Sequence, residues 1–142
     1  MLLGLFATVV ALLVTVVQVV DRDRQYRAFM ADGDAALAAG GAFTAVEAYS
    51  KALVVRSTSV AAYLRRGQAY HTQQRDDEAI RDWHEASRLA PRATQPLELL
   101  GDLFSRRGED AQAASYYERS VALDAQDPAR LYKLALARYR AG

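Results

Sequence analysis

Cysteine is absent from this 142-residue chain, which excludes disulfides, thiol nucleophiles and cysteine-ligated metals. Only two histidines are present, His71 and His84, and neither an HExxH pattern nor a glycine-rich phosphate loop occurs. A basic excess is lacking too, because 18 basic and 17 acidic residues give a net charge of +1. Such a balance offers nucleic acid no basic face. We therefore expect a non-catalytic protein with no metal, no cofactor and no nucleic-acid partner.

Charge is missing from the start of the chain, residues 1–20, which read MLLGLFATVVALLVTVVQVV. As a helix this run would extend about 30 Å, the thickness of the hydrocarbon core of a bilayer. The sequence therefore predicts a transmembrane helix over residues 1–20, in contact with lipid, and a juxtamembrane linker over residues 21–25. A cleaved signal peptide would have a basic start and a small-x-small cleavage site, and both are lacking. A buried core helix does not need so long an uncharged run.

Basic residues close to the predicted span set its orientation. Arg22, Arg24 and Arg27 follow the span and nothing but the amino terminus precedes it, which favours a cytoplasmic location for the remaining residues. Nearly all the basic residues are arginine and alanine is abundant, as is typical of a GC-rich bacterial genome. The location predicted is the bacterial inner membrane, in a single-pass protein.

Small residues recur along the predicted span. They are Gly4, Ala7, Ala11 and Thr15. Small side chains at such spacing let two membrane helices approach closely, which makes this a candidate contact face for other membrane subunits. Small residues are also common in membrane spans that have no such role, so both interpretations stay open.

The remaining sequence repeats at a constant period, and Gly33, Gly67 and Gly101 mark the same position in three successive copies. The middle copy has, in order, Tyr63, Gly67, Tyr70, Ala79, Trp83, Ala86 and Pro91. At matching positions the third copy has Leu97, Leu100, Gly101, Phe104, Ala113 and Tyr117. The first copy has Phe29, Gly33, Ala45, Tyr49 and Ala52. Each copy predicts two antiparallel helices, which in the middle copy cover residues 60–73 and 77–89.

Residue size within a copy indicates how its two helices cross. Gly67 and Ala79 are small where the backbones approach, and large side chains such as Trp83 fill the surrounding space. Asp77 suits the positive end of the second helix, and Pro91 turns the chain into the next copy. We expect Tyr49, Trp83, Phe104 and Tyr117 to be core residues.

This pattern resembles the tetratricopeptide repeat family over about residues 26–127. Tyr63, Gly67 and Tyr70, followed by Ala79, Trp83 and Pro91, carry the resemblance. It implies an all-α helical solenoid with a divergent first repeat at residues 26–59, a second at 60–93 and a third at 94–127. Arg66 stands where the family usually has leucine, which is a departure in the second repeat.

Residues 128–142 are predicted to form a capping helix, since an uncapped last repeat leaves apolar surface exposed. Leu131, Leu134 and Ala135 would face the solenoid. The side expected to face water carries Arg130, Lys133, Arg138 and Arg140.

The resemblance also implies where a protein or peptide partner would bind, which is the concave face lined by the first helix of each pair. The groove residues implied are Met30, Asp34, Leu64, Arg65, Gln68, His71, Glu98, Leu99, Asp102 and Arg106. Some family members capture a C-terminal carboxylate with basic and amide side chains on this face. Of the matching positions here only Arg65 is basic, so we expect no such clamp.

The function predicted is a membrane-anchored adaptor or scaffold that holds a protein or peptide partner in this groove. The alternative is a structural accessory subunit of a larger membrane complex, held mainly through its transmembrane helix. A third interpretation puts the repeats outside the cytoplasm, in envelope assembly, and an enzyme comes fourth.

Overall fold

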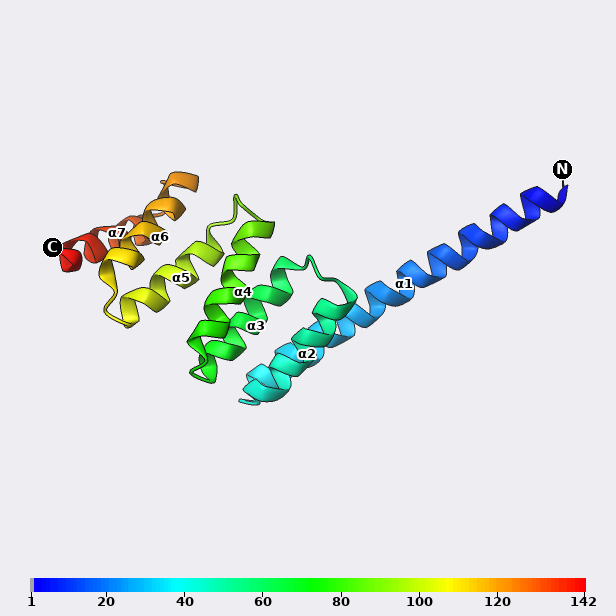
Figure 1. Cartoon of the computed structure of the whole chain (residues 1–142), viewed down its shortest axis with the longest axis horizontal. Coiled ribbons are helices and arrows are strands. Elements are labelled where there is room, and N and C mark those ends of the chain that lie inside the picture. Colours follow the sequence, from blue (N-terminus) through cyan, green and yellow to red (C-terminus); the bar gives the residue numbers. More distant parts are fainter. Residues whose placement is uncertain (1) are drawn as a thin grey trace. The chain divides into compact units, whose positions relative to one another are not determined.

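The computed structural model describes residues 2–142, with side chains from Val10 onward. All regular structure in these residues is helical, and it divides into two units, one up to Ser57 and the other Thr58–Gly142. The first unit contains α1 (Leu2–Ala38) and α2 (Ala42–Val55). The second contains α3 (Val60–Thr72), α4 (Asp76–Leu89), α5 (Gln95–Arg106), α6 (Asp110–Leu123) and α7 (Pro128–Ala141) (Figure 1).

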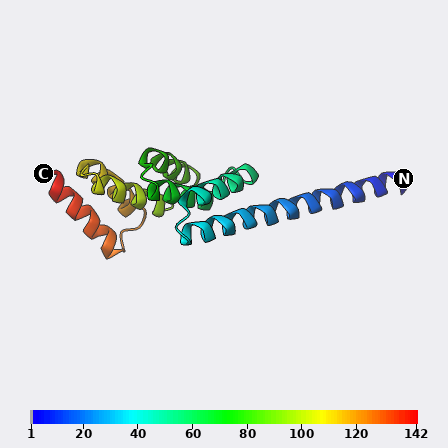
Figure 2. The same cartoon turned by 90° about the horizontal axis from the view of Figure 1, so that it is seen from below.

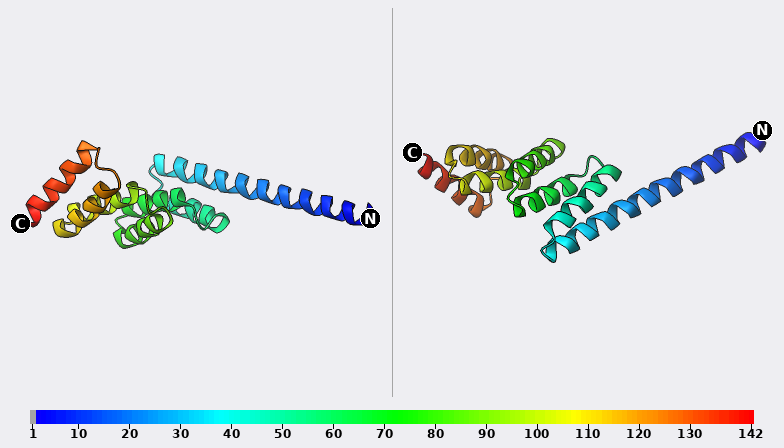
Figure 3. Two further views of the ribbon diagram at one scale, coloured as in Figure 1. Left: turned by 90° about the horizontal axis from the view of Figure 1, so that it is seen from above. Right: turned by 60° about the horizontal axis from the view of Figure 1, so that its bottom comes forward.

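The first unit is a hairpin in which α2 returns along the C-terminal part of α1 (Figure 3). Gly40 makes the turn with φ 79°, a left-handed conformation that glycine adopts without steric cost. The free end of α2 is tied to α1 by Arg56, which donates to Asp23 at 2.7 Å and stacks 4.0 Å above the Tyr26 ring. Arg22 adds a hydrogen bond to the carbonyl oxygen of Val55 at 2.8 Å.

The predicted membrane anchor is wrong, because no helix in the described part of the chain is long and apolar enough to cross a membrane. A span needs about 20 consecutive apolar residues to cross a hydrocarbon core of about 30 Å, and none is found among the residues described. The predictions of an inner-membrane location and of lipid contact through residues 1–20 both depended on this anchor, and they are corrected together with it.

At residues 21–25, predicted as a juxtamembrane linker, α1 continues without a break (Figure 2). Charged residues end an apolar run but do not end a helix, and Asp23 pairs with Arg27 one turn later at 2.8 Å. Of the predicted membrane contact face, Gly4 and Ala7 lie outside the residues whose side chains are described. Ala11 and Thr15 are exposed, and the Thr15 hydroxyl donates to the carbonyl oxygen of Ala11 at 2.8 Å within the same helix.

The second unit stacks helix pairs, with α3 against α4, α5 against α6, and α7 against α6. The first and last residues of α3 and α4 lie within one residue of the predicted bounds. Trp83, Phe104 and Tyr117 are buried in one hydrophobic cluster, and Tyr49 is buried in the first unit, as predicted. A Cβ added at Gly101 would lie 2.6 Å from the Tyr117 ring, so the missing side chain is what lets α5 and α6 approach.

The predicted orientation of α7 is right for Leu134 and wrong for Leu131, Ala135 and Arg130. Leu131, at 44% exposure, and Ala135 face away from the helices of this unit, while Leu134 and Ala137 are buried against α6. Arg130, predicted to face water, is buried as well. Contact with α6 covers one stripe of α7 and leaves the neighbouring stripe open, while Arg130 reaches Glu98 of α5.

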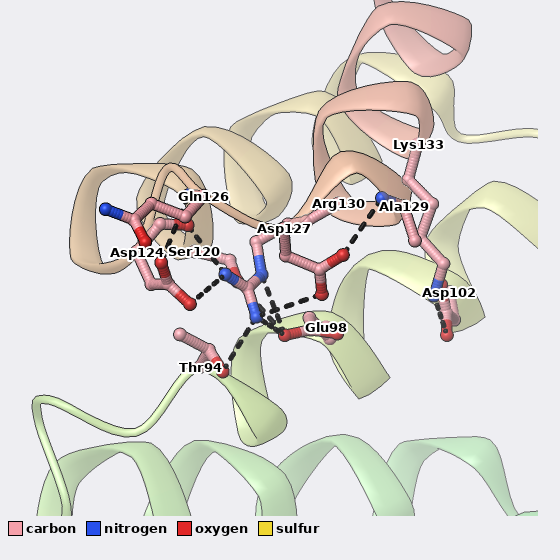
Figure 4. A network of polar contacts seen from close by, with 10 residues as sticks. All are labelled: Thr94, Glu98, Asp102, Ser120, Asp124, Gln126, Asp127, Ala129, Arg130 and Lys133. Carbon is pink, nitrogen blue, oxygen red and sulfur yellow. Dashed lines mark hydrogen bonds and ion pairs between the residues drawn. The ribbon is translucent and has the colours of Figure 1, made fainter.

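Arg130 lies at the centre of a polar network that joins α7 to α5 and to the loop after α6 (Figure 4). Its guanidinium donates to Glu98 at 3.0 Å and to the carbonyl oxygen of Asp124 at 2.6 Å, and it pairs with the Asp127 carboxylate at 3.5 Å. Burial disfavours the charge of Arg130, but its hydrogen bonds to Asp124 and Glu98 outweigh that and raise its pKa. The network fixes the position of α7.

Candidate partner-binding cleft

A cleft of about 310 Å³ opens in the second unit where side chains of α3 and α5 face each other. It is lined by Ala61, Leu64, Arg65, Gln68, Gln95 and Leu99. Leu64 and Leu99 are half-buried and rest on the hydrophobic cluster beneath, while Arg65 is exposed at the surface. The cleft thus has an apolar floor with polar and basic groups around it.

The repeat period explains why these side chains meet. Gln95 is the counterpart of Ala61 one period later, and Leu99 is the counterpart of Arg65. α3 and α5 occupy equivalent places in their repeats and bury equivalent faces. On both helices the side chains next to the buried face therefore point to the same side. The indole nitrogen of Trp83 donates to the carbonyl oxygen of Leu64 at 3.3 Å, which holds α3 at this place.

Four of the predicted groove residues line the cleft: Leu64, Arg65, Gln68 and Leu99. Gln95 also lines it, although it is not among the predicted groove residues. The signal that could have included both Gln95 and Ala61 is that they occupy the same position in successive repeats.

Two other predicted groove residues, Glu98 and Asp102, take part in contacts inside the second unit. Asp102 accepts hydrogen bonds from the Tyr117 hydroxyl and from Lys133, both at 2.7 Å. Glu98 accepts from Arg130. Burial and the hydrogen bond to Asp102 raise the pKa of Tyr117, so its hydroxyl stays protonated and donating. Both carboxylates therefore hold helices together.

His71 and Arg106 lie in the last turns of α3 and α5. The Nδ1 atom of His71 is 2.6 Å from an Asp76 carboxylate oxygen. Burial raises the pKa of Asp76, but its hydrogen bonds and charge interactions with His71 and Arg107 outweigh burial, and the pKa is lowered overall. His71 thus joins α3 to α4, whereas Arg106 is exposed.

Met30 and Asp34 belong to the first unit, on α1. Met30 is half-buried, and Asp34 accepts a hydrogen bond from the Tyr49 hydroxyl at 2.7 Å. Asp34 and Asp102 are two periods apart, and each accepts from the tyrosine on the second helix of its own pair. This tyrosine–aspartate pair is a repeated structural contact, whereas sequence reasoning assigned both aspartates to the groove.

Arg66, a departure from the family pattern, has a structural partner that sequence reasoning missed. Its guanidinium makes two hydrogen bonds of 2.8 Å to Asp82, whose side chain is 7% exposed. These bonds raise the pKa of Arg66 against the opposing effect of burial. The sequence does contain a signal for this contact. Arg66 immediately precedes Gly67, Asp82 immediately precedes Trp83, and Gly67 and Trp83 meet where the two helices cross.

Across the described residues, no three His, Cys, Asp or Glu side chains gather where they could hold a metal ion. His84 lies 3.1 Å from the Tyr116 hydroxyl, and burial together with the charge of Arg119 lowers its pKa. This contact joins α4 to α6.

Comparison with known proteins places the fold. No family model matches the chain. The small glutamine-rich tetratricopeptide repeat-containing protein 2 of Mycosarcoma maydis is 29% identical over 94 residues, which are 66% of this chain and 27% of that protein. The chain therefore spans about a quarter of the length of this curated relative.

Solved structures agree over most of the chain. The Sgt2 TPR domain of Aspergillus fumigatus superposes with a TM-score of 0.72 at 19% identity, covering 82% of this chain and 78% of that one. The fold is a tetratricopeptide-repeat solenoid. MamA gives a TM-score of 0.73 at 22% identity, with coverage of 86% and 72%. The first TPR of Spaghetti (RPAP3), solved bound to the HSP90 peptide SRMEEVD, gives 0.73 at 17%, with coverage of 82% and 92%.

Proposed function

We propose that this tetratricopeptide-repeat chain is a non-catalytic adaptor that binds a protein or peptide partner in the cleft between α3 and α5. The observation that carries the proposal is the pair of half-buried leucines, Leu64 and Leu99, at the floor of an open cleft. When a ligand covers partly exposed leucines beside polar groups, apolar surface is removed from water, and this lowers the free energy of the complex. The structural neighbour solved with an HSP90 peptide supports a peptide as the ligand.

The chemistry of the cleft restricts the partner. Among the six lining residues Arg65 alone is charged, with Gln68 and Gln95 as hydrogen-bonding groups. A segment with an apolar side chain for the leucines and one acidic or carbonyl group for Arg65 fits this set. A ligand recognised mainly through a terminal carboxylate needs more than one cation, so SRMEEVD is not expected to bind tightly.

The division into repeats forms part of the proposal. Residues 26–59, 60–93 and 94–127 are three repeats, and residues 128–142 are the cap. Under this division the binding cleft lies between the first helices of the second and third repeats.

Affinity purification with the full chain as bait tests the cleft. The double variant Leu64→Glu/Leu99→Glu places two charges on the apolar floor and should lose a partner that co-purifies with the unmodified chain. The matched control is Val54→Glu/Leu123→Glu, since Val54 is 85% and Leu123 41% exposed and neither lines the cleft.

Circular dichroism and thermal unfolding must first show that the three proteins have equal helix content and cooperative melting. A milder variant, Gln68→Ala, keeps the test valid if the charged pair perturbs folding. Retention of the same partners by the double variant and by Gln68→Ala would show that the cleft is not the binding surface.

A further inference from the structure

Gln68, which lines the cleft from α3, occupies a position that carries a structural contact in the other two repeats. One period earlier this position is Asp34, and one period later it is Asp102. Each aspartate accepts a hydrogen bond of 2.7 Å from a tyrosine hydroxyl on the second helix of its own pair, that of Tyr49 or Tyr117. In those two pairs the polar group of the first helix is therefore used inside the fold.

The second pair lacks this contact because both of its members differ. Trp83 stands where the other pairs have tyrosine, and its indole nitrogen donates to the carbonyl oxygen of Leu64 at 3.3 Å. An indole has a single donor, so none remains for Gln68. In the described part of the chain only the backbone carbonyl of Gln68 accepts from another side chain, that of Thr72 at 3.0 Å, and its amide group has no partner.

A second unpaired amide, that of Gln95, lines the same cleft from α5. Gln95 is exposed at the first residue of this helix, and its side chain makes no hydrogen bond within the described residues. Leu64 and Leu99 lie in the cleft beside the two amides. Each helix thus contributes one group that can both donate and accept, next to an apolar floor.

The equivalent position toward α7 is already occupied. Asp102 accepts from Lys133 at 2.7 Å as well as from Tyr117, and Lys133 is the counterpart of Leu99 one period later. A ligand at Asp102 would have to displace these contacts, whereas a ligand at Gln68 displaces water. The cleft between α3 and α5 is therefore where a polar group of this position is available to a partner.

We propose, as a refinement that rests on the function proposed above, that the amides of Gln68 and Gln95 bind the backbone of an extended partner segment. A side-chain amide donates through its nitrogen and accepts through its oxygen, which matches the C=O and N–H groups of a peptide unit. In an α-helix those groups are paired within the helix, so a helical partner offers them only at its ends. An extended segment exposes them along its edges while its side chains cover the leucines.

Peptide selection on the full chain supplies the probe. Random dodecapeptides displayed on phage are selected on the unmodified chain, and those that bind Leu64→Glu/Leu99→Glu at least about tenfold more weakly are kept, since the variant places charge on the apolar floor. This step tests the proposed function by itself. If selection yields no such peptide, the cleft fails as a binding surface, and the backbone contact fails with it.

Replacing each backbone N–H of the selected peptide in turn by an ester oxygen then removes one donor at a time. One replacement should weaken binding to the unmodified chain roughly fivefold, as expected for a single hydrogen bond. Gln68→Leu should weaken binding of the unmodified peptide by a similar factor, and on this variant the same ester should cost nothing more. A second ester position should couple in the same way to Gln95→Leu. Gln112→Leu is the matched control, since Gln112 is exposed on α6 and lies outside the cleft.

A second variant closes the position as the other repeats do. Gln68→Asp/Trp83→Tyr introduces the aspartate–tyrosine pair of the first and third repeats, so its two polar groups should bind each other while the leucines stay in place. Circular dichroism and thermal unfolding verify that the stack is intact. This variant should bind the selected peptide as weakly as Gln68→Leu does.

Two results would overturn the backbone contact while the cleft remains the binding surface. One is an ester scan that is identical on the unmodified chain and on Gln68→Leu, because no backbone donor of the peptide would then pair with this amide. The other is a selected peptide that NMR shows to be helical over the leucines when it is bound.

Discussion

Replacing Arg130 by methionine should destabilise the helical stack although the residue lies in the last helix. The side chain is 7% exposed, and its guanidinium bonds to Glu98 of α5 and to the carbonyl oxygen of Asp124 after α6. Methionine keeps much of the aliphatic stem but has no donor, so Arg130→Met removes these bonds and little of the packing.

The magnitude follows from the groups left behind. A hydrogen bond to a charged group contributes about 1.5–3 kcal/mol net, and Arg130 makes one of these to Glu98 beside a bond to a backbone carbonyl. The Glu98 side chain is 25% exposed and regains water when its partner is removed, which offsets part of the loss. We expect a net cost of about 2–3 kcal/mol, or a fall in Tm of roughly 6–12 °C.

Arg138→Met is the matched control, since it makes the same substitution two turns later in α7. Arg138 pairs with Glu118, but their side chains are 62% and 49% exposed, so the expected cost is below about 1 kcal/mol. Urea unfolding followed by circular dichroism measures both variants, and hydrogen exchange should show faster exchange at α7 amides in Arg130→Met.

Equal losses of stability in the two variants would refute this reasoning, because burial would then not distinguish the two arginines. A gain in stability on Arg130→Met would also refute it. That result would mean that the desolvation cost of the guanidinium exceeds what its bonds return.

Two further predictions concern the contacts within helix pairs. Gly101→Ala places a Cβ 2.6 Å from the Tyr117 ring, and the cost of overpacking, reduced by the better helix propensity of alanine, should be about 1–2 kcal/mol in urea unfolding; no loss would show that the ring can move aside. Because the pKa of Asp76 is lowered in the folded chain, its contribution is present above its ordinary value of 3.8 and is lost as pH falls through the folded pKa. Asp76→Asn should therefore flatten the acid limb of the Tm–pH curve, and an acid limb identical to that of the unmodified chain would contradict this.

The helix pairs and their cores follow from local pattern. Glycine at the crossing and an aromatic residue at a fixed position on the second helix recur in all three copies, and this size complementarity is built into the sequence whatever its surroundings. Tyr49, Trp83 and Tyr117 were predicted as core residues on that ground and are buried. The turn residues predicted the first and last residues of α3 and α4 to within one position.

The predicted end of the first helix at Asp21 falls inside α1, where no second copy of the pattern exists for comparison. A run of uncharged residues was taken to end at Asp21 as a separate element. The helix instead continues to Ala38, because residues 21–24 interrupt apolar character without removing a backbone hydrogen bond.

The sequence by itself determined the period, the helix pairs and the aromatic core, because these depend on residues at fixed separations within a repeat. Tertiary structure alone decided that the carboxylates predicted for the groove pair with other helices and which way α7 faces. Glu98 and Asp102 have groove spacing, yet Arg130, Lys133 and Tyr117 reach them from other helices. A helical face can be assigned from spacing, but its partners depend on how neighbouring helices rotate, and that is settled by the packing of all of them together.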